Sequence, residues 1–109
     1  MSVEEFAKYV VDNLYRATIS NSLAIVKRLY DVNPKEHTAI YNVDEFLDAL
    51  DSYIGKALEQ NTIKHSVGIK LLASVYSCRE ALNSDKKYQK LMILDNLIIE
   101  MWEITVSSQ

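Results

Sequence analysis

Glycine, proline and cysteine are scarce in this 109-residue chain, which holds two glycines, one proline and one cysteine. Strands and tight turns depend on glycine and proline, so their scarcity favours long helices joined by short connections. A single cysteine excludes an internal disulfide framework and suits a reducing compartment. At this length we expect one domain, residues 1–109, with a hydrophobic core of its own.

Other absences narrow the class of protein. The net charge is −3 and the isoelectric point about 5.3, so the chain lacks the basic excess of nucleic-acid-binding domains. The N-terminal residues MSVEEF lack the basic and apolar regions of a signal peptide. No apolar run reaches the roughly 18 residues that span a bilayer. We therefore expect a cytoplasmic protein that binds neither nucleic acid nor a membrane directly.

The chain also lacks the sequence motifs of enzymes. It contains no glycine-rich phosphate loop and no recognisable pairing of a nucleophile with a base. His37 and His65 have no partner at the spacing of zinc ligands, and neither is placed beside Cys78. Cys78 lies on an apolar stripe and is interpreted as a small buried residue. We expect a protein that is not an enzyme and that uses no cofactor and no metal.

Apolar residues at helical spacing are present along most of the chain. Ser2 with Glu5 and Asn42 with Glu45 show the pattern of a capping box. The chain is predicted to be all-α, a single-domain antiparallel bundle of four to five helices. The number of helices depends on whether the chain bends or breaks between residues 18 and 22. These ranges are approximately 3–18, 22–31, 43–59, 63–82 and 85–106.

The last predicted helix, residues 85–106, is apolar over more than half of its circumference. Its polar residues fall within one arc of about 60°, and they are Gln89, Asn96, Glu100 and Glu103. An ordinary surface helix has an apolar stripe of about 100°. The pattern therefore predicts either a central helix that is covered on several sides or a helix that also meets a partner.

Asp95 is the only acidic residue that the helical pattern places inward, one turn from Leu91 and Ile99. As a functional residue it would be a buried acid with a raised pKa, but no second catalytic group can be aligned with it. As a structural residue it would be a carboxylate paired within the core, and this interpretation is favoured. In a third interpretation, Asp95 and Trp102 belong to a self-association interface, where Asp95 provides specificity.

Three aspartates line one side of the helix predicted over 43–59. Asp44, Asp48 and Asp51 fall within an arc of about 60°, with Glu45 adjacent. The dipole of the helix explains acids in the first turn, but Asp48 and Asp51 lie beyond it. Such a stripe is either a solvated face, neutralised in part by a Lys or Arg of another helix, or a patch for a basic partner. The solvated face is the commoner case.

Seven tyrosines supply apolar rings with polar tips, which suit interfaces, and Tyr41 directly precedes the acidic stripe. Our leading hypothesis is a small cytoplasmic protein-binding module, an acidic inhibitor of the immunity or antitoxin type. It would mask the basic cleft of a nuclease-like toxin. The predicted binding residues are Tyr41, Asp44, Glu45, Asp48 and Asp51. The alternative is a non-catalytic structural or regulatory homodimer that associates through the last helix, at Asp95 and Trp102.

Overall fold

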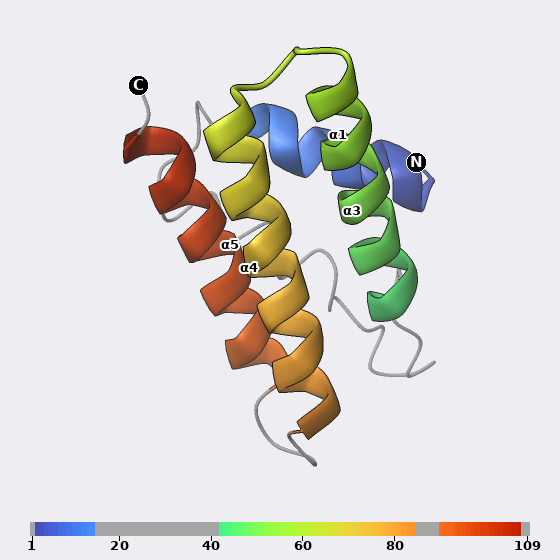
Figure 1. The fold of residues 1–109 in the computed structure, drawn as a ribbon. Coiled ribbons are helices and arrows are strands. Elements are labelled where there is room, and N and C mark those ends of the chain that lie inside the picture. Colours follow the sequence, from blue (N-terminus) through green and yellow to red (C-terminus); the bar gives the residue numbers. More distant parts are fainter. Residues whose placement is uncertain (1, 15–41, 85–89, 108–109) are drawn as a thin grey trace.

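Four helices form the part of the chain described by this computed structural model, residues 2–14, 42–84 and 90–107. They are α1 (Val3–Asn13), α3 (Val43–Glu59), α4 (His65–Ser84) and α5 (Lys90–Ser107), and these residues include no strand. In Figure 1, α3, α4 and α5 run in alternating directions, and α1 runs across this row. Helix α3 packs against both α1 and α4, and α4 packs against α5. The predicted all-α antiparallel bundle is confirmed.

Two of the helix starts follow from the predicted capping residues. Ser2 Oγ accepts the backbone N–H of Glu5 at 3.1 Å, and Asn42 Oδ1 accepts that of Glu45 at 3.1 Å. Each bond satisfies a donor that the first turn of a helix leaves without an intrahelical partner. Helix α3 has the limits predicted for it. The predicted helix 22–31, and the predicted helical residues 15–18 and 85–89, lie outside the described part of the chain.

The end of α3 explains why α4 begins at residue 65 and not at the predicted residue 63. Asn61 has a positive φ of 56°, and its N–H donates to Leu58 O at 3.2 Å. The N–H of Thr62 donates to Ala57 O at 2.9 Å. This pair of bonds is a Schellman motif, which satisfies carbonyls left unpaired at a helix end. The motif extends past residue 61, so α4 starts two residues later than predicted. It ends at Ser84, also two residues beyond the predicted limit.

All four helices contribute to one core. The rings of Phe6 and Phe46 lie 5.4 Å apart at an angle of 47° and join α1 to α3. Helix α5 buries a narrow face that includes Thr105, whose hydroxyl donates to Met101 O at 2.9 Å. None of the described helices combines the length and the apolar character needed to cross a membrane. The largest fully buried side chains are Phe6, Leu14, Phe46, Leu47, Leu50, Ile54, Leu71, Leu94, Leu97, Ile98 and Met101.

Candidate functional site

The candidate site is the charged outer surface of α1 and α3, which pack against each other. All eight carboxylates of these two helices are exposed, whereas their only bases are Lys8 and Lys56, which gives a formal charge of −6. Helices α4 and α5 together carry four acids and three lysines or arginines, a formal charge of −1. We call the eight carboxylates the acidic surface: Glu4, Glu5, Asp12, Asp44, Glu45, Asp48, Asp51 and Glu59.

The three aspartates of the predicted stripe are all exposed, but they differ in their partners. Asp48 Oδ1 accepts a hydrogen bond from Arg79 Nη2 of α4 at 2.9 Å. The side chains are 70% and 32% exposed, so this ion pair contributes little to stability. Asp44 and Asp51 make no ion pair with another described residue. The interpretation as a neutralised face therefore holds for Asp48, while Asp44 and Asp51 present their charge to the solvent.

The other two residues predicted for the site have different outcomes. Glu45 has a structural role through its backbone N–H, which bonds Asn42, and its side chain is exposed beside the aspartates. Tyr41 lies outside the described residues, so its part in the site stays a prediction. The described portion of the predicted site is thus carried entirely by the first three turns of α3.

A contact that the sequence analysis missed joins the two helices of the acidic surface. The hydroxyl of Tyr53 donates to Asp12 Oδ1 at 2.6 Å. Burial and this hydrogen bond raise the pKa of Tyr53 to about 12, so the hydroxyl remains a donor into the alkaline range. A hollow of about 260 Å³ adjoins the pair. The available signal was a tyrosine on the apolar face of α3, because a half-buried hydroxyl needs a partner.

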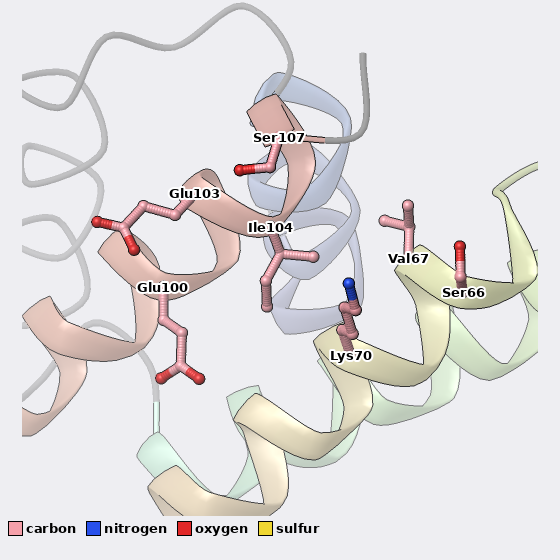
Figure 2. A pocket seen from close by; sticks show the side chains of 7 residues that line it. All are labelled: Ser66, Val67, Lys70, Glu100, Glu103, Ile104 and Ser107. Atoms are coloured by element: carbon pink, nitrogen blue, oxygen red, sulfur yellow. The ribbon is translucent and has the colours of Figure 1, made fainter.

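A groove between α4 and α5 contains the polar arc predicted for the last helix. Asn96, Glu100 and Glu103 all line it, and Ser74 Oγ donates to Glu100 Oε1 at 2.9 Å. Its larger hollow, of about 280 Å³, is drawn in Figure 2, where Lys70 and Glu103 point in different directions. Catalytic and ligand pockets bring a few polar groups together at one point. The larger hollow lacks that convergence.

Cys78 lies beneath the same groove and is 5% exposed. Burial raises the pKa of its thiol to about 11, whereas a nucleophilic cysteine needs access and a lowered pKa. The prediction of a small buried residue is confirmed. Within the described residues, no group of three His, Cys, Asp or Glu side chains is arranged to hold a metal ion.

Asp95 and Trp102 are half-buried, at the edge of the buried face of α5. As predicted, Asp95 is the most inward acid, since every other acid in the described part of the chain is exposed. It is half-buried and not enclosed, because the apolar arc of α5 is wider than the face that the core covers. Leu94 and Ile98 occupy the centre of that face, and Trp102 packs against the core from the side. The self-association proposed for Asp95 and Trp102 stays a prediction.

Comparison with known proteins yields no relative. No family model, no curated protein and no solved structure matches the chain.

Proposed function

We propose that the protein is a small cytoplasmic protein-binding module that inhibits a basic partner, as an immunity protein or antitoxin masks a nuclease-like toxin. The supporting observation is the acidic surface, with eight exposed carboxylates against two lysines. A surface of one sign steers a partner of the opposite sign and speeds their association. A nuclease presents basic side chains to the phosphates of its substrate. An acidic domain bound to those basic side chains excludes the nucleic-acid substrate, because it repels the phosphates and blocks the cleft sterically.

Asp44 and Asp51 are the members of the acidic surface that we expect to contribute most to binding. Neither makes an ion pair with another described residue, so a basic side chain of the partner has no competitor there. They lie about 10 Å apart along α3, with Asp48 between them. The helix already holds the three carboxylates at fixed separations, so binding does not require the backbone to be ordered.

The proposal is tested by capture followed by an activity assay. The tagged chain is used as bait in extract of its native cell, and captured proteins are identified by mass spectrometry. Each is then assayed for nuclease activity with increasing amounts of the chain. We expect a basic protein that is inhibited at a one-to-one ratio, and whose association slows as salt is raised.

A matched pair of variants shows whether the acidic surface is responsible. Combining Asp44→Asn with Asp51→Asn should slow association about tenfold or more at low salt. Combining Glu80→Gln with Glu103→Gln removes the same charge from α4 and α5, and should leave the rate close to that of the unmodified chain. Equal binding by both variants, or a captured partner whose activity is unchanged, would contradict the proposal.

The alternative function is a structural or regulatory homodimer that associates through α5. Two observations favour it: Met92 is 53% exposed and Val106 is 39% exposed, and both lie on the side of α5 that carries Trp102. Such a dimer depends on apolar contact and should persist at high salt. Sedimentation of the purified chain, with and without Trp102→Ala, measures whether this dimer forms. A salt-insensitive dimer that Trp102→Ala dissociates is the expected result for this alternative.

A further inference from the structure

The hollow beside Tyr53 is formed by the C-terminal halves of α1 and α3 and by the connection that follows α3. Its wall is mostly apolar. Its volume of about 260 Å³ is a little below the roughly 300–1,000 Å³ of pockets that enclose a small molecule, and it suits a single side chain inserted from outside. We call it the Tyr53 hollow, and its described lining residues are Val11, Asp12, Tyr53, Ala57, Thr62 and Ile63.

The polar side chains among these lining residues have already donated their own protons. The Tyr53 hydroxyl donates to Asp12 Oδ1 at 2.6 Å, and the Thr62 hydroxyl donates to Ala57 O at 3.3 Å. What these side chains still offer is the lone pairs of the two hydroxyls and the second oxygen of the Asp12 carboxylate, all of which are acceptors. A polar ligand of the Tyr53 hollow must therefore be a hydrogen-bond donor.

The electrostatics of the Tyr53 hollow favour a cation. Asp12 is the only charged residue of the described lining, and no base of the described chain forms an ion pair with it. The C-terminal ends of α1 and α3 carry partial negative charge, and the last turn of α1 contains no base. A carboxylate in that turn is unfavourable for the helix, so a bound cation offsets a cost that the unbound chain carries.

We propose that the Tyr53 hollow binds an arginine side chain of the basic partner, an inference that rests on the proposed function and names the group that the inhibitor holds. The guanidinium donates to the second oxygen of Asp12 and lies against the Tyr53 ring, while its aliphatic stem covers the apolar wall. Arginine fits better than lysine because its planar fork of five donors reaches several separate acceptors at once.

Titration of the full chain with a blocked arginine, N-acetyl-arginine methylamide, tests the hollow without any partner. We expect a saturable change in the NMR signals of Tyr53 and Ile63, with a dissociation constant of about 1–10 mM at low salt. Blocked lysine should bind about threefold or more weakly, and blocked norleucine, which has an apolar stem without a charge, should not bind in this range. The proposal is overturned if arginine gives no saturable change, or if lysine or norleucine binds as tightly.

Asp12→Asn separates the Tyr53 hollow from the general charge of the protein. The amide oxygen still accepts the Tyr53 hydroxyl, but the amide nitrogen is a donor where the guanidinium needs an acceptor. This variant should weaken the binding of blocked arginine about tenfold or more. The matched control, Glu103→Gln, removes an equally exposed carboxylate from α5 and should change the affinity less than about twofold. Equal weakening by both variants would show a general effect of charge and overturn the proposal.

The captured partner provides a second test, in which this inference and the proposed function can fail separately. Removing one member of an enclosed charge pair raises the dissociation rate, whereas removing exposed charges mainly slows association. Asp12→Asn should therefore speed dissociation of the partner about tenfold or more. If the partner is inhibited but Asp12→Asn leaves its dissociation rate unchanged, the hollow does not hold its arginine, although the proposed function stands. If no basic partner is captured, the proposed function fails, while the titration still shows whether the hollow takes a guanidinium.

Discussion

The pair α1 and α3 differs from the pair α4 and α5 in where its polar contacts lie, at the edge of the helix contact or between the two helices. In α1 and α3 the charged side chains are all exposed, and the hydrogen bond between Tyr53 and Asp12 lies at the rim of the helix contact. In α4 and α5 a polar pair, Ser74 and Glu100, lies between the helices, while Ile69 is exposed on the outside. The first pair therefore has a surface suited to a charged partner. The second has one suited to apolar contact.

The largest effect is expected from removing the aromatic contact that unites α1 with α3. Phe46 is 1% exposed and its ring lies 5.4 Å from that of Phe6. Phe46→Ala should lower the free energy of unfolding by about 3–5 kcal/mol, measured by chemical denaturation. The control is Tyr9→Ala: Tyr9 is 37% exposed and 6.4 Å from Phe6, so its loss should cost under about 1.5 kcal/mol. Equal costs would mean that the buried ring contact does not hold this pair together.

Alkaline pH should lower the stability of the protein through Cys78, which lies between α4 and α5. Its pKa is about 11 in the folded state against an ordinary value of 9.0, so the unfolded chain loses this proton first. The free energy of unfolding should therefore fall as pH rises from about 9 to about 11, by up to about 2–3 kcal/mol. Below pH 9 this contribution is fully present. Chemical denaturation of the unmodified chain and of Cys78→Ala across this pH range isolates the contribution of the thiol. If the free energies of unfolding of the two proteins changed in parallel with pH, the thiol would have the same pKa in the folded and unfolded states.

The two glycines provide a matched comparison between a crowded and an open helix surface. A Cβ on Gly68 of α4 would lie 2.3 Å from Leu58 Cδ2 and 2.6 Å from Leu58 Cγ, whereas one on Gly55 of α3 would meet nothing within 4 Å. Gly68→Ala should therefore destabilise the fold by about 1–2 kcal/mol. Gly55→Ala should stabilise it by about 0.5–1 kcal/mol, because glycine is unfavourable inside a helix. Shifts of the same sign in thermal denaturation would refute this difference.

The sequence was most informative where structure depends on neighbouring residues. Side-chain caps act over three residues, so Ser2 and Asn42 were recognised as helix starts and α3 was predicted with its actual limits. The end of α3 was predicted, but the Schellman motif that delays α4 was not. That motif depends on the left-handed conformation of Asn61, which a helical pattern does not reveal.

Contacts between distant residues were not predictable in the same way. The exposure of Asp44, Asp48 and Asp51 followed from the helical wheel, but the wheel could not show that Arg79 reaches Asp48. The wheel also singled out Asp95 as the inward acid of α5, but it could not show that Asp95 is only half-buried, because the apolar arc of α5 is wider than its buried face. A wheel gives the direction of a side chain and not how much of that side the neighbouring helices cover.

The smallest effect is expected at the ion pair that links the two helix pairs, Asp48 with Arg79. A double-mutant cycle with Asp48→Asn and Arg79→Gln should give a coupling free energy of about 0.2–1 kcal/mol, which decreases as salt is added. The value is small because the Asp48 carboxylate is 70% exposed and remains hydrated.

This small coupling also decides how Asp48 acts in the proposed inhibitor. If the pair is weak, Arg79→Gln removes a positive charge beside the acidic surface with almost no loss of stability. The variant should then associate with a basic partner faster than the unmodified chain, by about two- to fivefold at low salt. If the coupling instead exceeds about 1.5 kcal/mol, Asp48 is held as a structural partner of α4. In that case Arg79→Gln should also lower the free energy of unfolding, and Asp44 and Asp51 would carry the charge of this stripe alone in the unmodified chain.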